Sequence, residues 1–375
     1  MPTAPAADPS RLRSTGGTSS VRRPHRWHAL LALVVTTGLA IGTSLALPPT
    51  AAHAATGGYV ALGDSYSSGT GTETYYDDGT DCLRSPKAYG PLLAASQGRP
   101  LTFAACSAAT TSDVVNQQLS SLRSDTSLVT ITIGGNDVGF VPVLTECAKP
   151  SWWGDCDAAI SNALAIANGQ LPGRLASLYS AIRSRSPQAE VVVAGYPHIF
   201  NGEDCNALTF FSGTEMSKLN AAADQLDAVT RRAALAAGFR YADPVSTFAG
   251  HAVCDDTEWI NGLSWPIVES FHPNVAGHRG YAALLAPLTT SARTATSRRA
   301  VDADSSRAAT PELPTAEGKS EQVAVPDLSS AAARAAARRA GISQRDLTAL
   351  QDAQRRGASN STLERLSEQA VSAAR

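Results

Sequence analysis

Residues 59–65 read YVALGDS, a short apolar run that stops at a glycine-bounded turn. A run of this length followed by turn residues predicts a buried strand that leads into a loop. Two further runs have the same form, LVTITIGGND at 128–137 and AEVVVAGYP at 189–197. Helix-like stretches lie at 89–96, at 111–122, at 158–185 with an interruption at Pro172-Gly173, and at 214–237. Strands that alternate with helices predict parallel βαβ units, and therefore a three-layer α/β domain around a parallel sheet.

The overall charge is close to balanced, and this excludes some classes of partner. The 375 residues carry a formal net charge of -2, and 17% of them are charged. No global basic field is available to attract nucleic acid or an anionic membrane surface. The chain also contains no phosphate-binding loop of the form GxxxxGK[ST] and no complete dinucleotide fingerprint. We therefore expect no nucleic-acid partner and no nucleotide cofactor.

The first 54 residues have the layout of a secretory signal peptide. Arginines up to Arg26 precede an apolar run at 29–47, and the small-residue stretch AAHAA follows at 51–55. This order predicts export with cleavage after Ala54, by a route that the sequence leaves open. The alternative is a membrane anchor, since about 19 apolar residues just suffice to span a bilayer. Threonines, glycines and a serine dilute the run, so we expect a secreted protein without stable membrane insertion after cleavage.

All six cysteines lie beyond this segment, and an even number in an exported chain predicts disulfides. Six cysteines allow fifteen pairings, so the count does not decide among them. We favour sequential pairing, because each bond then closes a local loop: Cys82 with Cys106, Cys147 with Cys156, and Cys205 with Cys254. No C-x-x-C pair is present, so no zinc or other metal site is expected.

The composition divides the rest of the chain into three parts. Residues 57–288 hold the strand and helix pattern and form the predicted catalytic domain. Residues 289–327 are rich in Ser, Thr, Arg, Ala and Pro, which predicts a disordered linker. Residues 328–375 show helical spacing of leucines and predict a small helical C-terminal appendage.

Three residues at strand ends or on a terminal loop offer chemistry in combination. Ser65 follows the first strand, Asn136 follows a later one, and His272 lies on a proline-bounded loop near the end of the domain. Ligands bind beyond the carboxyl ends of parallel strands, so these residues are expected to meet there. A serine needs an adjacent base to become nucleophilic and needs donors for the oxyanion, and these residues supply those roles.

These blocks resemble the conserved blocks of SGNH/GDSL hydrolases over about residues 57–288. The resemblance rests on GDS at 63–65, GGND at 134–137 and HPN at 272–274. The form GDSYSSG at 63–69, the segment ACS at 105–107 and the six cysteines look most like secreted actinobacterial lipases, esterases and phospholipases A1. The resemblance implies a flavodoxin-like α/β/α fold, an ester or lipid substrate, no cofactor and a monomeric enzyme.

The resemblance also implies roles for individual residues. Ser65 matches the nucleophile and one backbone oxyanion donor, Asn136 matches the side-chain donor, and His272 matches the base. Ala108 stands where the family usually has a glycine whose N–H is another donor. Alanine keeps the N–H group but lacks the freedom of glycine at positive φ.

The partner of the histidine has two candidates. The family's aspartate stands three residues before the histidine, and this chain has Glu269 there. A glutamate can accept a hydrogen bond from His272 Nδ1 and hold the ring in one tautomer. The alternative is a backbone carbonyl near Ser270, with Glu269 as a solvated charge. Asp64 is expected to organise the loop around the serine, and His278 to pack in the terminal loop.

The predicted function is a serine ester hydrolase that forms an acyl-enzyme on Ser65 with His272 as base. One alternative is a short-chain acetylesterase that acts on carbohydrate or other polar esters, and a preference among acyl-chain lengths would separate the two. A second alternative is a binding module without catalysis, because a fold does not dictate a function. Tryptophans at 152, 153, 259 and 265 are candidates for an apolar acyl groove, although core or rim packing is their more common role.

Overall fold

The computed structural model describes residues 58–206, 208–290, 310–319 and 321–375. The predicted signal peptide at 1–54 and residues 291–309 of the predicted linker lie outside these ranges. Among the described helices, none combines the length and the apolar character needed to cross a membrane.

Five parallel strands form one sheet in the order β2-β1-β3-β4-β5. They are β1 (Tyr59–Gly63), β2 (Leu101–Phe103), β3 (Leu128–Thr132), β4 (Glu190–Ala194) and β5 (Arg240–Ala242). The three predicted strands are β1, β3 and β4, and they are almost completely buried, in line with their mainly apolar and β-branched residues. The strands β2 and β5 have three residues each and are too short to leave a pattern in the sequence. The predicted parallel α/β fold is confirmed.

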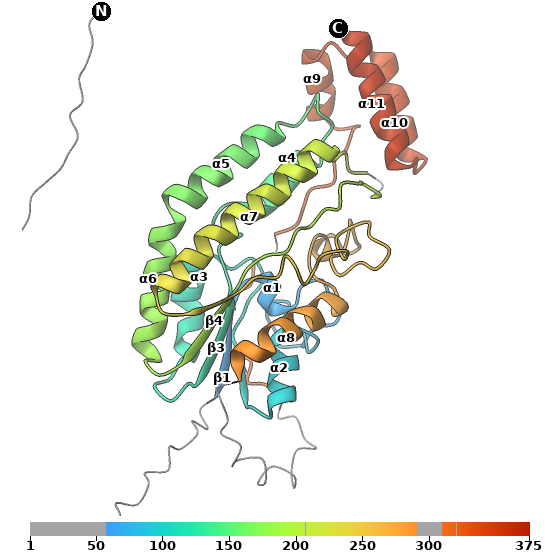
Figure 1. Cartoon of the computed structure of the whole chain (residues 1–375). Coiled ribbons are helices and arrows are strands. Elements are labelled where there is room, and N and C mark those ends of the chain that lie inside the picture. The colour runs from blue at the N-terminus through green and yellow to red at the C-terminus, as the bar shows by residue number, and fades with distance from the viewer. Residues whose placement is uncertain (1–57, 207, 291–309, 320) are drawn as a thin grey trace, which may run out of the picture. The chain divides into compact units, whose positions relative to one another are not determined.

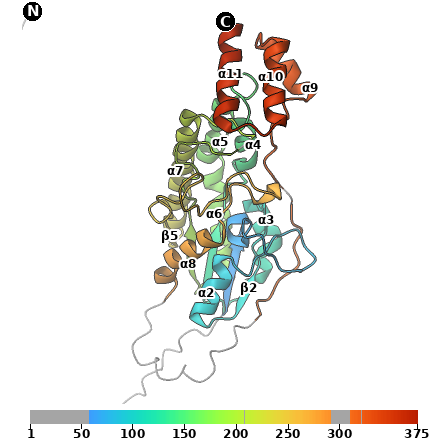
Figure 2. The same ribbon diagram turned by 90° about the vertical axis from the view of Figure 1, so that its right-hand side faces the viewer.

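Helices cover both faces of the sheet, with α2 and α8 on one side and α6 and α7 on the other (Figures 1 and 2). The helices of this part are α1 (Ser65–Ser68), α2 (Tyr89–Gln97), α3 (Thr111–Asp113), α4 (Phe140–Cys147), α5 (Cys156–Gly169), α6 (Leu171–Arg185), α7 (Gly213–Ala236) and α8 (Val275–Thr289). After α3 the chain continues as a π-helical turn, Val114–Gln118, and a 3₁₀ turn, Leu119–Ser121. The predicted helix at 158–185 is two helices, and the break falls at Gln170. Pro172 lies in the first turn of α6, where a proline is well tolerated.

The turn after β1 depends on glycine. Gly63 has φ of 122°, and a Cβ atom added there would lie 2.3 Å from the carbonyl oxygen of Thr132 on β3. The register sets Gly63 directly beside Thr132. The loops that leave β1 and β3 therefore emerge at the same edge of the sheet.

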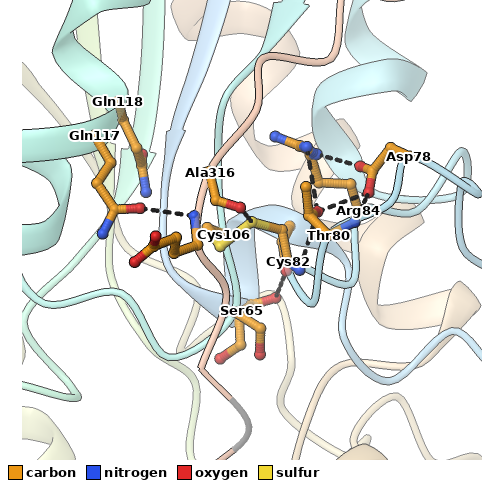
Figure 3. Close-up of a disulfide and its surroundings, with 12 residues drawn as sticks. Ser65, Asp78, Thr80, Cys82, Arg84, Cys106, Gln117, Gln118 and Ala316 are labelled. Atoms are coloured by element: carbon orange, nitrogen blue, oxygen red, sulfur yellow. Dashed lines mark hydrogen bonds and ion pairs between the residues drawn. A yellow bond between two sulfur atoms is a disulfide. The ribbon is translucent and has the colours of Figure 1, made fainter.

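Three disulfides join the cysteines in sequential pairs: Cys82–Cys106, Cys147–Cys156 and Cys205–Cys254. They close loops with sequence separations of 24, 9 and 49 residues. The first joins the loop after α1 to the loop after β2, both of which lie near Ser65 (Figure 3).

The described part of the predicted linker differs from the expected disorder. Glu312 forms a parallel bridge with Thr102 and exchanges backbone hydrogen bonds with Leu101 and Phe103, so this segment pairs with the open edge of β2. Farther along, the Val323 side chain is 4% exposed and belongs to the main hydrophobic core. Main-chain pairing at a sheet edge requires no apolar periodicity, which explains why the sequence gives no sign of it.

The C-terminal appendage is helical, as predicted. It contains α9 (Ala331–Arg339), α10 (Gln344–Arg355) and α11 (Asn360–Ala374). Their apolar side chains form a second hydrophobic cluster, which also includes Phe210 and is contacted by Trp152 and Trp153. The indole N–H of Trp152 donates to Ser367 Oγ at 3.1 Å.

Candidate active site

Ser65 begins the short helix α1 directly after the β1 turn. The preceding Asp64 caps this helix by accepting a hydrogen bond from the Tyr66 backbone N–H. The Asp64 carboxylate also accepts from Thr132 Oγ1 at 2.6 Å and from the Tyr196 hydroxyl. Burial raises the pKa of Asp64 to about 6. These partners lie in α1, at the end of β3 and in the loop after β4, so Asp64 orders the turn that presents Ser65.

Ser65 and His272 are in direct contact across 207 residues of sequence. His272 Nε2 lies 2.8 Å from Ser65 Oγ, and Nδ1 lies 2.9 Å from the Ser270 carbonyl oxygen. A carbonyl oxygen only accepts, so Nδ1 carries the proton and Nε2 is the acceptor that faces the serine hydroxyl. Burial lowers the pKa of His272 to about 4, against the opposing effect of hydrogen bonds to the Ser270 and Val268 backbones. The ring is therefore neutral at neutral pH, as a base must be.

Glu269 lies elsewhere, although it is only 1% exposed. One carboxylate oxygen accepts from the Tyr75 hydroxyl, and the other accepts from the Glu73 backbone N–H at 3.4 Å. Of the two candidates for the partner of the histidine, the Ser270 carbonyl is the one at hydrogen-bond distance from Nδ1. The buried Glu269 is also not the solvated charge that the second alternative assumed, because its carboxylate closes the loop that contains Tyr75.

The loop that presents His272 is held in a strained conformation. Phe271 has φ of 61°, which is unusual for a bulky residue. Its carbonyl accepts from the Tyr66 hydroxyl at 2.9 Å, and its N–H donates to the Asn261 carbonyl at 2.9 Å. The Asn261 N–H in turn donates to the His272 carbonyl at 2.9 Å. Contacts on both sides of the histidine therefore fix the direction of its ring.

The two other candidate oxyanion donors belong to neighbouring loops. Asn136 follows β3, and its Nδ2 donates to the Ala109 carbonyl at 3.0 Å, which leaves the second hydrogen of the amide for another acceptor. Ala108 has φ of 59°, the left-handed conformation for which a glycine is the usual choice. The loops are tied together because the Thr111 backbone and hydroxyl both donate to the Asp137 carboxylate, at 2.9 Å and 2.7 Å.

Ser65 and Asn136 border a cavity with predominantly apolar walls. It encloses about 830 Å³, including the part open to solvent. Apolar side chains on α4, α5 and α7 form most of its lining, among them Phe140, Leu144, Ala163, Leu164 and Leu226. The site thus joins a hydrogen-bonded Ser–His pair to a space that suits a hydrocarbon chain.

Several other candidates lie outside this cavity. His278 is fully buried beside Tyr89, and burial lowers its pKa to about 3, so it packs as a neutral ring. None of the four tryptophans considered above borders the cavity. Trp259 stacks on His251, while Trp265 is 73% exposed.

Polar residues that belong to no sequence motif also position the site. Gln118 exchanges two hydrogen bonds of 2.8 Å with the Gly63 backbone, and the Tyr196 hydroxyl accepts from the Gly135 N–H at 3.1 Å. Such residues are recognisable only by their burial, which a single sequence does not report.

Comparison with known proteins places this chain in a family. The model of the GDSL-like Lipase/Acylhydrolase family matches residues 61–279. Lipase 1 of Streptomyces coelicolor is 44% identical over 255 residues, which cover 67% of this chain and 93% of the relative. A lipase of Streptomyces rimosus is 42% identical over 258 residues, covering 68% and 94%.

Two solved structures are also similar. The extracellular lipase of Streptomyces rimosus has a TM-score of 0.58 and 41% identity, with 62% of this chain and 99% of that one covered. Phospholipase A1 of Streptomyces albidoflavus has a TM-score of 0.58 and 43% identity, covering 62% and 97%. The chain therefore belongs to the GDSL-like Lipase/Acylhydrolase family and is a carboxylic ester hydrolase.

Proposed function

We propose that the protein is a secreted lipase or phospholipase A1 that hydrolyses apolar acyl esters through an acyl-enzyme on Ser65. The observation that carries this proposal is the 2.8 Å contact between Ser65 Oγ and His272 Nε2 at the border of the apolar cavity. The Streptomyces lipases and the phospholipase A1 that resemble this chain support the same substrate class.

In the first half-reaction, Ser65 Oγ attacks the ester carbonyl carbon while His272 Nε2 takes the hydroxyl proton. The resulting imidazolium is stabilised by its Nδ1–H bond to the Ser270 carbonyl. When the tetrahedral intermediate collapses, the bond between the carbonyl carbon and the alcohol oxygen breaks. His272 Nε2–H protonates the departing alcohol, and the acyl group remains on Ser65.

In the second half-reaction, water replaces the alcohol. His272 Nε2 takes one proton from the water as its oxygen attacks the acyl carbon, and the same proton returns to Ser65 Oγ when the acid leaves. In both steps the developing oxyanion accepts from the Ser65 N–H, the Ala108 N–H and the Asn136 amide. Donors that are already oriented stabilise this charge without the cost of rearranging during the reaction.

The acyl chain is proposed to occupy the apolar cavity. Walls from α4, α5 and α7 offer few polar partners, which favours a hydrocarbon chain over a short acetyl group on a sugar. A short-chain acetylesterase would leave most of this space unfilled. A non-catalytic binding module would not need a neutral histidine hydrogen-bonded to a serine.

Secretion is part of this proposal. It rests on the signal-like residues 1–54 and on the three disulfides, which persist in oxidising compartments.

A series of 4-nitrophenyl esters from acetate to palmitate tests the substrate class, with protein that lacks residues 1–54. The proposal predicts kcat/KM that rises with chain length to at least the octanoate ester. A maximum at acetate would contradict the lipase assignment and favour the acetylesterase. Hydrolysis of sn-1-acyl phospholipid in mixed micelles, measured beside triacylglycerol, separates a phospholipase A1 from a lipase.

A further inference from the structure

Residues 312–319, which we call the strap, run beside the catalytic domain from a point beyond the end of the family match at residue 279. The strap begins as an added strand: the Phe103 N–H donates to the Glu312 carbonyl and the Glu312 N–H donates to the Leu101 carbonyl, both at 2.8 Å. Figure 2 shows this brown segment passing β2 and α3 on its way to α9. A part of the chain outside the family match is thus built onto the edge of the catalytic sheet.

The strap then packs tightly over the Cys82–Cys106 disulfide. The Ala316 carbonyl oxygen lies 4.0 Å from Cys82 Sγ (Figure 3). At Gly318 there is no room for a side chain, because an added Cβ would lie 2.3 Å from the Asp81 carbonyl carbon and 2.7 Å from the Cys82 nitrogen. The strap backbone is therefore in direct contact with the disulfide loop at this glycine.

At its end the strap holds the loop that contains Ala108. Lys319 Nζ lies 2.9 Å from both carboxylate oxygens of Asp113. Asp113 also accepts from the Thr110 N–H at 2.9 Å and from the Thr110 hydroxyl at 2.6 Å, closing a capping box at the start of α3. Lys319 thus fixes the carboxylate that ends the loop at 106–113, which we call the oxyanion loop.

A second contact reaches the turn at residues 63–65, which we call the nucleophile turn. The Glu317 N–H donates to Gln117 Oε1 at 3.0 Å, while the adjacent Gln118 exchanges two hydrogen bonds with Gly63. These two glutamines belong to the π-helical turn Val114–Gln118, a type of distortion that is frequent at functional sites. The π-helical turn thus connects the strap to the backbone two residues before Ser65.

The oxyanion loop in turn positions the Asn136 donor. The Asn136 amide donates to the Ala109 carbonyl, and Thr111 holds the Asp137 carboxylate with two hydrogen bonds. Both donors that lie outside the nucleophile turn, the Ala108 N–H and the Asn136 amide, therefore depend on one short loop.

We infer that the strap is a positioning element for the oxyanion hole, with Lys319 as a positioning residue that acts through Asp113 and with Gly318 as its point of close contact. This inference rests on the proposed function, because it assigns the strap to the same reaction. It adds a role for a segment outside the family match. The competing role is inhibition: if the strap covered the site, loosening it would raise the rate of the reaction.

Two variants of the full chain test the inference. Gly318→Ala forces the strap away from Asp81, and Lys319→Met removes the ion pair, while Lys319→Arg keeps it. Matched controls are Gly173→Ala, where nothing lies within 4 Å of the added Cβ, and Lys218→Met, which removes an exposed pair with Asp157.

The kinetic readout is hydrolysis of a soluble 4-nitrophenyl ester. Lys319→Met is expected to lower kcat about two- to fivefold, because the free energy lost with an exposed ion pair corresponds to a factor of about this size. Gly318→Ala is expected to lower kcat about tenfold, since small misplacements of catalytic groups are costly. KM stays unchanged in both, Lys319→Arg restores kcat, and the controls match the wild type. A kcat equal to or above that of the wild type in Gly318→Ala would overturn the inference.

Hydrogen exchange gives a second readout that does not require activity. The amides of residues 106–113 are expected to exchange faster in Gly318→Ala and in Lys319→Met, while those of β3 and β4 keep their protection. Unchanged exchange in residues 106–113 would overturn the inference even if the enzyme is active. Full activity of Ser65→Ala, measured beside these variants, would overturn the proposed function instead, so the two failures are distinguishable.

Discussion

The Nδ1 atom of His272 lies 2.9 Å from the carbonyl oxygen of Ser270, so a main-chain group occupies the place that a carboxylate has in a Ser–His–Asp triad. A carbonyl fixes the tautomer as a carboxylate does, but it brings no full negative charge beside the ring. The buried ring therefore keeps a low pKa, of about 4.

Glu269→Gln should change kcat/KM by less than about tenfold, because the Glu269 carboxylate does not hold the histidine. By comparison, altering the aspartate of a true triad costs on the order of 10⁴ in kcat. The rate of ester hydrolysis checks this expectation. The variant should fold, since Gln keeps an acceptor for the Tyr75 hydroxyl, and thermal melting of the same sample checks that it does. A loss of 10³-fold or more in the folded variant would restore Glu269 as the partner of the histidine.

The pH dependence of kcat/KM follows from the same contact. A base with a pKa of about 4 is neutral above that pH and protonated below it. The acid limb should therefore have its midpoint near pH 4, and the rate should fall about tenfold for each pH unit below it. Initial rates from pH 3 to 8, on enzyme shown to stay folded over that range, provide the test. A midpoint near 6.5 would mean that His272 is solvated in the working enzyme.

Asn136→Ala should lower kcat by about 10²–10³, the typical cost of one lost oxyanion donor. KM for a short ester should change little, because the amide acts mainly on the charge that develops in the transition state. Asn168→Ala, at an exposed amide on α5, is the control. Wild-type turnover in the Asn136 variant would remove this residue from the oxyanion hole.

Ala163→Phe should shift the preferred acyl chain towards shorter esters. Ala163 on α5 borders the apolar cavity, and an aromatic ring there would occupy part of the space proposed for the acyl chain. Activity on acetate should be retained while activity on long-chain esters falls. Ala165→Phe, on the exposed side of the same helix, is the control. An unchanged chain-length profile would show that the acyl group binds elsewhere.

Much of this architecture could be predicted from the sequence because it depends on short, mainly apolar runs and on short polar motifs. The runs at β1, β3 and β4 are buried strands, and Ser65, Asn136 and His272 stand in motifs that the structure brings to one site. Strands of three residues could not be found in this way. Nor could the strap, since its pairing with β2 uses main-chain atoms.

The partner of the histidine shows the same limit at the level of one hydrogen bond. Every residue has a backbone carbonyl, so residue identity gives no signal that Ser270 supplies the acceptor. Glu269 was a natural candidate because its side chain is of the right type. Its burial against Tyr75 becomes visible only in three dimensions.

Every step of the proposed reaction requires Ser65 to be the nucleophile. The most direct test is the rate of 4-nitrophenyl octanoate hydrolysis by the wild type and by Ser65→Ala, together with mass spectrometry of the wild type after treatment with an alkyl phosphonate ester. If Ser65 is the nucleophile, the variant loses activity to the background rate and the phosphonyl group is found on Ser65 alone. Substantial activity in a folded Ser65→Ala variant, or modification at another residue, would contradict it.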